Sequence, residues 1–508
     1  MRCAVGSVLV CSLVLTVCGV PAMAAKTAPP LPGPPPDAVY VDYPWELSTA
    51  MTNLTSGQTI VLNPGVYDLG KYAHTYTVTG KTNITIRGAT NDPNDVVVIG
   101  AGMNTAGSTP IIFLMSNCSN VLIANMTLRD VYDHLIQLQG DVEYFHIYNC
   151  RLIDCRTQFM KVQLGSDDGL VEYCIFEFTD RAVDDYTDAI DCINYCNRWV
   201  IRDNTFLRMR GPIGQRAGAA ILMWCVCEDS LVERNEFIEC DMGIHFGNPG
   251  GHTDGDHIRG IIRNNFFYRA PGGSGPTSLS DVAISLNYCL GAKVHNNTII
   301  YNQTFDWLIE GRFSNTTADV YNNITDDDDE PYWPPIYERD GGTLNQVANL
   351  TDAGTTPEWF VGFESGDLHL TAAATDAIDQ AVSVPEVTDD FDGDARPVGD
   401  GPDIGADEFT GGSSLPGQAS SPSPANGATK VSRSVILSWT AGSGADSHDV
   451  YFGTNPSPGP SEFQGNQPET TFDPGYLGKN TWYYWRIDEV NTNGTTTGVV
   501  WSFKTGSR

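Results

Sequence analysis

The sequence predicts an all-β protein, a right-handed parallel β-helix solenoid followed by a small β-sandwich. The first observation behind this prediction is a short sequence motif, called the word below, that recurs along the middle of the chain. It consists of a β-branched residue, two further residues, Asn in the later copies, and then an apolar pair. The β-branched residues of successive copies are Ile123, Ile147, Val171, Ile201, Val232, Ile262, Val294 and Val320. They follow one another at intervals of 24 to 32 residues, and self-similarity at such a period is typical of repeat architectures.

The second observation is the content of the copies. Each copy is a short run of β-branched and aromatic residues, and no long helical stripe occurs between Met115 and Asn323. Helical repeats are therefore excluded. Leucine-rich repeats are excluded because they need a Leu-dominated consensus, and propellers because one blade is longer than these copies. A parallel β-helix with one coil per copy remains, and the crossover rule for parallel strands makes it right-handed.

The third observation is the recurring Asn, which is Asn204 in the copy Trp199–Met209. Asn tolerates the left-handed backbone of a tight corner. Its amide can also bond to the Asn of the coils above and below, as in the Asn ladders of stacked sheets. Cys150 and Cys174 occupy the same position in two earlier copies, which indicates that the ladder continues there inside the stack.

The N-terminus has the features of a secretory signal peptide. Arg2, an apolar run over 8–17 and the small-residue site Ala22-Met-Ala24 predict cleavage after Ala24. A lipoprotein alternative at Cys18 fits poorly because Val17 precedes it. No later segment reaches the length of apolar residues that spans a membrane. We therefore expect a secreted or cell-surface protein, extracellular or periplasmic.

Composition restricts the partners. A formal net charge of −33 excludes nucleic acid, because phosphate binding needs a basic face. An anionic polysaccharide would also be repelled, unless the binding groove is locally basic or a bound cation screens it.

The cysteines remaining after removal of the signal peptide all lie between Cys118 and Cys289. In an exported protein the close pairs Cys192/Cys196 and Cys225/Cys227 can form disulfides, but buried free thiols explain them equally well. A zinc site is not expected, because no Cys pair has a His at ligand spacing.

The chain divides by composition. An amphipathic helix over 43–53 is expected to cap the first coil and to hide its unpaired strand edge. A Gly/Ser/Pro stretch separates the repeats from short alternating strands that carry Trp439, Tyr484 and Trp501 as core aromatics. The predicted order is signal peptide 1–24, Pro-rich linker 25–37, β-helix with N-terminal cap 38–345, closing segment 346–409, linker 410–421 and sandwich 422–508.

A second strand per coil supplies an outward row of side chains. If the Ile or Met of each strand faces the core, the next residue faces out. The outward row is then Gln137, Lys161, Asp191, Leu222, His245 and Ser285, and the register of Glu310 is less secure because its coil has an extra residue.

The densest charged cluster in the longest coils predicts the functional site. Its acidic residues are Asp184, Asp185, Asp188 and Asp191. Carboxylates in such a loop can hold Ca²⁺, the candidate cofactor, and Asp188 and Asp191 can also bind sugar.

Other residues near this cluster are candidates for proton transfer and sugar binding. Lys161 or His245 can remove a proton next to a uronate carboxylate, once the metal or an Arg neutralises that carboxylate. Arg216 and Arg312, with Arg210 in reserve, are the clamp candidates because the guanidinium fork matches a carboxylate. Trp224 is either a sugar platform or a packed residue, and Glu310 is a further sugar contact. The alternative interpretation of all these charges is a solvated face of a very acidic protein.

The words Met160-Lys161-Val, Asp188-Ala-Ile-Asp191 and Asp241-Met-Gly-Ile-His245 occur in an order that resembles exported bacterial proteins of the pectate-lyase-like superfamily, over Val39 to Asn323. Residues 422–508 resemble a fibronectin type III module. The resemblance implies a polysaccharide laid along the groove of the β-helix. It identifies no single family, because the Asp-Pro-His motif of mannuronan epimerases is absent and the adjacent aspartates Asp184 and Asp185 lie in a loop, unlike the aspartate pairs of polygalacturonases.

The sequence therefore predicts a carbohydrate-active protein. The leading hypothesis is a monomeric polysaccharide lyase that cleaves a uronate-containing polysaccharide by β-elimination. Lys161 is the first candidate base and His245 the second. Two alternatives stay open: a glycoside hydrolase of the same fold that uses two of the aspartates, and a non-catalytic glycan-binding surface or matrix protein.

Overall fold

The computed structural model forms two compact units, residues 1–409 and 410–508, each described by itself below. The structure describes residues 26–507 except 71–74, 105–109, 185, 216, 271–281, 303–306, 327–333, 352–356, 411–415, 443–444 and 492–493. The predicted signal peptide therefore lies outside the described residues. Among the residues that are described, no helix is long and apolar enough to cross a membrane.

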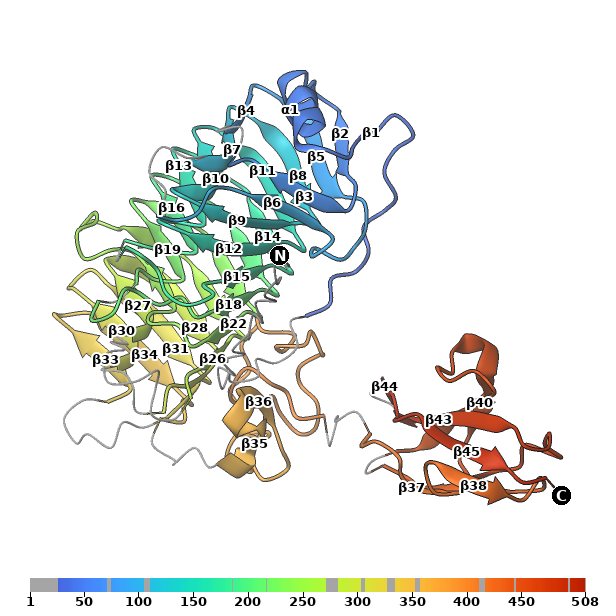
Figure 1. Cartoon of the computed structure of the whole chain (residues 1–508). Coiled ribbons are helices and arrows are strands. Elements are labelled where there is room, and N and C mark those ends of the chain that lie inside the picture. Colours follow the sequence, from blue (N-terminus) through green and yellow to red (C-terminus); the bar gives the residue numbers. More distant parts are fainter. Residues whose placement is uncertain are drawn as a thin grey trace, which may run out of the picture. The chain divides into compact units, whose positions relative to one another are not determined.

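The first unit is a right-handed parallel β-helix of three parallel sheets (Figure 1), which confirms the predicted fold class. Each coil passes through sheet C, then sheet A, then sheet B. Sheet A contains β1 (Val39–Val41), β2 (Thr59–Leu62), β5 (Thr82–Gly88), β8 (Ser119–Ala124), β11 (Glu143–Tyr148), β14 (Leu170–Glu172), β17 (Val200–Arg202), β20 (Cys227–Glu228), β21 (Leu231–Glu233), β24 (His257–Ile258), β25 (Ile261–Arg263), β28 (Cys289–His295), β31 (Thr317–Tyr321) and β34 (Thr343–Val347).

Sheets B and C complete each coil. Sheet B contains β3 (Gly65–Asp68), β6 (Val96–Ile99), β9 (Thr127–Val131), β12 (Arg151–Cys155), β15 (Ile175–Glu177), β18 (Thr205–Leu207), β22 (Glu236–Ile238), β26 (Phe266–Tyr268), β29 (Thr298–Ile300) and β32 (Ile324–Thr325). Sheet C contains β4 (Tyr76–Thr79), β7 (Ile111–Ser116), β10 (His134–Gln139), β13 (Met160–Gln163), β16 (Ile190–Ile193), β19 (Ile221–Trp224), β23 (Ile244–Phe246), β27 (Val282–Asn287), β30 (Trp307–Arg312) and β33 (Ile336–Arg339).

The repeated word forms the strands of sheet A, and its β-branched residues are register partners from coil to coil, as predicted. Behind them the aromatic residues of the words stack inside the core. The rings of Phe176, Phe206, Phe237 and Phe267 follow one another with centroids 4.9, 4.8 and 4.5 Å apart. One continuous core therefore runs along the stack.

The Asn ladder is present, but one reason given for it is wrong. Asn265 donates from Nδ2 to Asn297 Oδ1 at 2.9 Å, and Asn204 donates from Nδ2 to Asn235 Oδ1 at the same distance. The left-handed residue of this corner is the one before the ladder Asn, for example Asp203 at φ 56° and Arg234 at φ 53°. The ladder position thus requires the amide side chain and not the tolerance of Asn for a left-handed backbone.

The thiols extend this ladder into earlier coils. The backbone N–H of Cys150 donates to Cys174 Sγ at 3.4 Å, and that of Cys174 donates to Asn204 Oδ1 at 2.9 Å. All ten cysteines in the described chain are free, and all but Cys225 are buried. The alternative of buried free thiols therefore holds in this structure.

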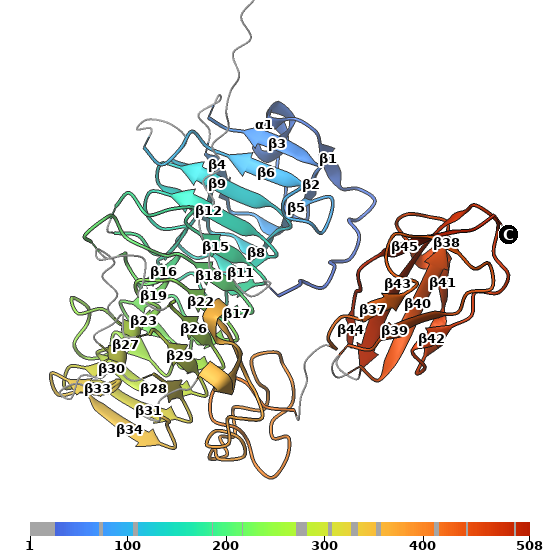
Figure 2. The same ribbon diagram turned by 60° about the horizontal axis from the view of Figure 1, so that its bottom comes forward.

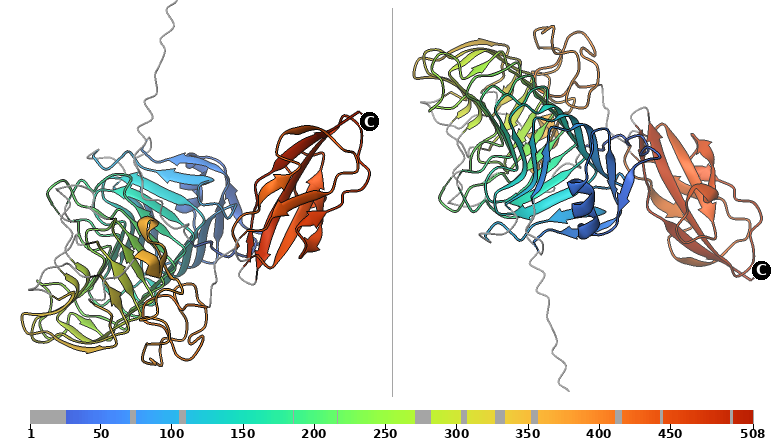
Figure 3. Two further views of the ribbon diagram at one scale, coloured as in Figure 1. Left: turned by 90° about the horizontal axis from the view of Figure 1, so that it is seen from below. Right: turned by 90° about the horizontal axis from the view of Figure 1, so that it is seen from above.

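The N-terminal cap is the helix α1 (Pro44–Thr52), close to the predicted range. It buries Leu47, Ala50 and Met51 against the first coil and lies in front of the N-terminal end of the stack in the right-hand view of Figure 3. Residues 26–37, expected to be a linker, lie against sheet A. Arg87 donates to the Pro32 carbonyl at 2.6 Å and Tyr148 to the Pro29 carbonyl at 2.5 Å.

The closing segment packs on the outer face of sheet B, beside β22 and β26 (Figure 2). It contains the short 3₁₀ helices η1 (Pro357–Trp359) and η2 (Phe363–Ser365) and the strand pair β35 (Phe360–Gly362) and β36 (Asp367–Leu370). Its Phe360, Leu368 and Phe391 form a second core with outward residues of sheet B such as Phe266.

The second unit consists of a three-stranded and a six-stranded sheet. Trp439 and Trp501 are buried as predicted, but the neighbour Trp485, and not Tyr484, fills the core. Ala419, which lies in the predicted linker, is buried in this core as well. The elements are β37 (Ser420–Ser423), β38 (Ala428–Val431), β39 (Leu437–Thr440), β40 (Ser447–Gly453), η3 (Pro460–Glu462), β41 (Phe463–Gln467), β42 (Thr471–Phe472), β43 (Trp482–Asn491), β44 (Gly494–Thr496) and β45 (Trp501–Thr505).

His257 is expected to make the β-helix acid-sensitive. Its ring is fully buried on β24 and stacks on Phe246 with centroids 3.9 Å apart, and neither ring nitrogen has a hydrogen-bond partner in the described structure. Burial lowers the pKa of His257 to about 3. Below the ordinary value of about 6.5 the unfolded chain therefore binds a proton that the folded chain refuses. The free energy of unfolding therefore loses nothing to His257 above pH ~6.5, and it decreases as the pH falls from there toward 3.

We predict that His257→Phe raises the stability by about 1 kcal/mol at pH 7, because it removes a buried unpaired polar group. The gain grows by up to about 1.4 kcal/mol per pH unit below 6.5. Thermal denaturation of variant and parent at pH 7 and pH 5 measures both effects, and contributions of the carboxylates cancel in the comparison. The exposed His252 provides the control variant His252→Phe. Equal losses on acidification in parent and His257→Phe would contradict the prediction.

Candidate functional site

The outward row of sheet C is formed as predicted. Lys161 is the register partner of Gln137 and of Asp191, Leu222 follows Asp191, and His245 follows Leu222. The row continues through Ser285 to Glu310, which settles the register of the latter. Adjacent strands lie about 4.8 Å apart, so His245 is about 14 Å and Glu310 about 24 Å from Lys161 along the row.

The centre of the row is a bonded set around Asp191, which is completely buried. Lys161 Nζ donates to Asp191 Oδ2, and Trp224 Nε1 donates to Asp191 Oδ1 at 3.0 Å. Burial acts to lower the pKa of Lys161, but the carboxylate of Asp191 outweighs it, so the pKa of Lys161 is raised. Trp224 is half-buried, and its N–H is fixed by the bond to Asp191. The residue is therefore neither a free sugar platform nor fully packed.

Asp188 lies in the corner before β16 and does not face solvent. Its exposed fraction is 2%, and Gln158 Nε2 donates to its Oδ2 at 3.5 Å while Oδ1 has no partner among the described atoms. Burial, followed by the charge of Asp191, raises the pKa of Asp188 well above its ordinary value. Asp188 therefore lies buried beside Asp191, whose carboxyl is bound to Lys161.

The remaining predicted residues do not join this set. Asp184 pairs with Arg156 at 3.4 Å, while Asp185 and Arg216 lie outside the described residues. Arg312 is bound to Asp340 at 2.8 Å, in the same coil as Glu310 and far from Lys161. Arg210, the third clamp candidate, is bound to Glu239.

Glu310 and His245 lie in separate polar environments further along the row. Glu310 accepts from Ser285 at 2.8 Å and from Arg339 at 3.3 Å. His245 is half-buried with an unpartnered Nε2, and burial lowers its pKa to about 4. Lys161 and Asp191 are in contact, whereas His245 stands about 14 Å further along the row.

Two residues next to Lys161 were missed at the level of sequence. Tyr186 is 54% exposed, and its ring centre lies 5.8 Å from Lys161 Nζ. His134 is the first residue of β10, one coil earlier, with Nδ1 3.1 Å from the Gln158 carbonyl, and burial lowers its pKa. Tyr186 stands in a corner, where the alternation that reveals a strand is absent. The position of Tyr186 within the acidic cluster was the one available signal.

Side chains able to hold a metal ion converge elsewhere. Within the described part of the chain, the one group of three His, Cys, Asp or Glu side chains with ligand atoms in mutual reach is His369, Asp392 and Asp407. The predicted groove aspartates that are described do not form such a group. Asp390, part of the Asp-x-Asp-Gly-Asp turn, accepts backbone N–H groups of Asp392 and Asp394 and so closes a turn.

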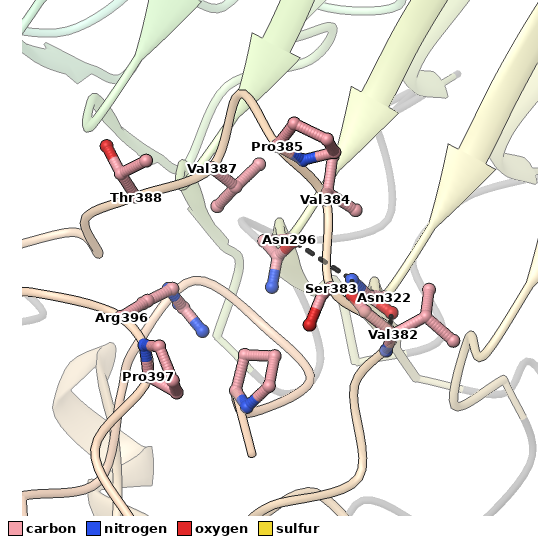
Figure 4. Close-up of a pocket in the computed structure, with 11 residues that line it drawn as sticks. Asn296, Asn322, Val382, Ser383, Val384, Pro385, Val387, Thr388, Arg396 and Pro397 are labelled. Atoms are coloured by element: carbon pink, nitrogen blue, oxygen red, sulfur yellow. Dashed lines mark hydrogen bonds between the residues drawn. The ribbon is translucent and has the colours of Figure 1, made fainter.

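A cavity of about 230 Å³ lies between the closing segment and the corner of sheets A and B (Figure 4). Asn322 donates to Asn296 at 3.3 Å on its floor. The guanidinium of Arg396 is already bound to the carbonyls of Asp403 and Gly405 and to Glu408. None of the predicted site residues lines this cavity.

Three stacked parallel sheets with an outward polar row place the chain in the class of parallel β-helix proteins. It matches no protein-family model and no curated protein sequence. Among solved structures it is similar to the pectate lyase Pel9A, with 12% identity over 74% of this chain and 97% of that one and a TM-score of 0.41.

Two further solved structures are similar. An alginate lyase from Paenibacillus sp. str. FPU-7 shares 15% identity over 62% of this chain and 99% of its own, with a TM-score of 0.37. The catalytic unit of a GH87 α-1,3-glucanase from Streptomyces thermodiastaticus strain HF3-3 shares 14% identity over 65% and 70%, with a TM-score of 0.41. The activity of this chain must therefore be inferred from its own residues.

Proposed function

We propose that this chain is an exported polysaccharide lyase that cleaves a uronate-containing polysaccharide by β-elimination on sheet C. The observation that carries the proposal is the bonded set of Lys161, Asp191 and Trp224 next to the exposed ring of Tyr186. A lysine anchored on a rigid strand, with an exposed aromatic ring beside it, can hold a sugar and exchange a proton with it.

In this proposal the neutral amine of Lys161 takes the proton next to the uronate carboxylate. The bond between the ring carbon and the glycosidic oxygen breaks as the double bond forms, and the leaving oxygen takes a proton from water. Asp191 and Trp224 fix the position of Lys161. The carboxylate of the sugar needs a neutralising charge. Arg216 or a Ca²⁺ ion would supply it, and a chelator distinguishes the two.

The first test is an assay of uronate polysaccharides that records ultraviolet absorbance of the unsaturated product, with and without chelator. Absorbance that develops with protein supports the lyase. New reducing ends without absorbance would identify a glycoside hydrolase instead. That alternative draws on one observation, the two neighbouring carboxyl groups of Asp188, whose pKa is raised by burial, and of Asp191, which is bound to Lys161, because hydrolysis requires an acid and a base. Binding without either product would identify a glycan-binding protein.

The raised pKa of Lys161 predicts an alkaline enzyme. A base must be deprotonated to accept a proton, and the pKa of Lys161 lies above the ordinary value of about 10.4. We therefore expect kcat/KM to rise through the alkaline range, about tenfold per pH unit, up to the limit of the protein's stability. A pH profile of initial rates checks this. A maximum at neutral pH followed by a decline would contradict the role of Lys161 as base.

A further inference from the structure

The seam between the closing segment and sheet B contains a second cluster of polar side chains, independent of the proposed polysaccharide site. On β22 the ring of Phe237 points into the core stack, so its neighbour Glu236 points outward, toward the closing segment. Next to it on β26, Phe266 stacks on Phe391 with centroids 4.1 Å apart and lies 5.2 Å from the ring of His369. The outer face of sheet B and the closing segment thus meet at Glu236 and His369.

Three side chains of the closing segment converge at this seam from three separate stretches. His369 lies on β36, Asp392 in the turn at 389–394 and Asp407 in the last stretch of the first unit. One ligand atom from each lies within 4.8 Å of the other two. Imidazole nitrogen and carboxylate oxygen are ligands of first-row transition metals, and the approach is close enough for a metal–ligand distance of about 2.1 Å after small side-chain shifts.

The second imidazole nitrogen of His369 has the partner that a metal-bound histidine needs. Nδ1 donates to Asp367 Oδ1 at 2.6 Å, while Nε2 faces Asp392 Oδ2 at 2.9 Å. A carboxylate that accepts from one ring nitrogen fixes the tautomer and directs the other nitrogen toward a metal. Asp367 therefore orients His369, and Nε2 is its ligand atom.

Glu236 supplies an independent observation. The side chain has an exposed fraction of 4% and its Oε1 has no hydrogen-bond partner in the described structure, while Oε2 accepts only from Thr205 at 3.3 Å. Because the ring of Phe237 on the same strand points into the core, the carboxyl of Glu236 points outward, toward the closing segment that carries the cluster. A buried carboxylate without a partner is costly unless a cation lies beside it.

The nearby lysine does not meet this need. Lys26 Nζ donates to Asp203 at 3.1 Å and to the Phe391 carbonyl, and it lies 3.9 Å from the centre of the Phe391 ring. The basic side chains at the seam are Lys26 and His369, and the carboxyl groups there are those of Glu236, Asp367, Asp392 and Asp407. Asp203 binds Arg234 as well as Lys26. The cluster has more acidic groups than cations.

We propose that His369, Asp392, Asp407 and Glu236 bind a divalent transition-metal ion of the Zn²⁺ class, which joins the closing segment to sheet B. Three protein ligands come from the closing segment and the fourth from the β-helix, so the ion crosses the seam. Ca²⁺ is the less suitable occupant, because it takes six to eight oxygen ligands and no imidazole. The ion is structural in this proposal and needs no polysaccharide.

The test uses the full chain after removal of metals with a chelator and dialysis. Zn²⁺, Co²⁺ and Ca²⁺ are each titrated alone by calorimetry, and Co²⁺ also by its visible absorption, which reports nitrogen ligation. We expect one Zn²⁺ or Co²⁺ per chain, weaker Ca²⁺ binding and a higher Tm with Zn²⁺. Stronger binding of Ca²⁺ than of Zn²⁺, or no binding of any of the three, would overturn the proposal.

Variants assign the ligands. His369→Gln, Asp392→Asn and Glu236→Gln should each weaken Zn²⁺ binding by at least about 10- to 100-fold, and His369→Gln should also change the Co²⁺ spectrum. His146→Gln is the matched control, because His146 also pairs with a carboxylate, Glu172 at 3.1 Å, on the same β-helix. Circular dichroism confirms that each variant is folded. Equal Zn²⁺ affinity in the parent and in all three variants would show that the ion binds elsewhere.

Discussion

Asn265→Leu is expected to destabilise the β-helix by at least about 4 kcal/mol and to lower its Tm more than any surface substitution. The amide of Asn265 is completely buried. Its Nδ2 donates to the carbonyls of Val232 and Arg263 and to Asn297 Oδ1, at 2.9 to 3.0 Å. Its Oδ1 accepts the backbone N–H and the side-chain Nδ2 of Asn235. Leu fills a similar volume but leaves these groups unpaired, at about 1–3 kcal/mol for each.

Thermal or denaturant unfolding of the purified chain measures this loss. The matched control is Asn345→Leu, since the side chain of Asn345 is exposed on sheet A and donates to Asp319 at 2.9 Å. We expect a change within about 0.5 kcal/mol for that surface variant. A loss in Asn265→Leu no larger than in Asn345→Leu would show that the ladder does not hold the coils together.

The ladder also shows how far the fold could be predicted. The period of the word, the register of Ile201 on Val171 and Val232, and the amide ladder all follow from repetition, since identical positions of a solenoid must stack. The backbone conformation of the corner did not follow. Arg234 adopts φ 53° although Arg has no preference for a positive φ, because the geometry of the corner outweighs the local preference.

The site could be predicted where it lies on strands and not where it lies in corners. The contact between Lys161 and Asp191 follows from strand alternation plus stacking, because both are outward residues of adjacent coils. Counting strands also places His245 three strands away from Lys161 along the row. Tyr186 has no periodic position, and its approach to Lys161 is set by a turn that one sequence does not specify.

The metal cluster illustrates the same limit more strongly. Glu236 is about 130 residues from His369 in the sequence, and they meet because the closing segment folds back over sheet B. In the turn 390–394, Asp390 bonds to backbone while Asp392 faces the cluster. Residue types alone do not distinguish these two roles, since the direction of each side chain decides.

Lys161→Arg is expected to reduce kcat by about 10²- to 10⁴-fold while the protein stays folded. The guanidinium keeps the positive charge opposite the buried Asp191, whereas an uncharged replacement would leave that carboxylate unpaired at about 3–5 kcal/mol. Arginine does not release its proton at any pH the protein tolerates, so it cannot serve as a base. The variant therefore separates the two roles that a lysine can have here, proton acceptor and fixed cation.

The measurement is the initial rate of unsaturated product on the best uronate substrate, per folded protein, with the Tm as a check. Lys293→Arg is the matched control, because Lys293 also pairs with a carboxylate, Glu386, but on sheet A. An active Lys161→Arg enzyme would assign Lys161 to carboxylate neutralisation and the proton transfer to another group.

Asp191→Asn adds a second readout. Without the carboxylate that raises its pKa, Lys161 loses its proton more easily. The rise of kcat/KM should then move to lower pH, whereas a purely structural Asp191 would lower the rate at every pH without moving the profile.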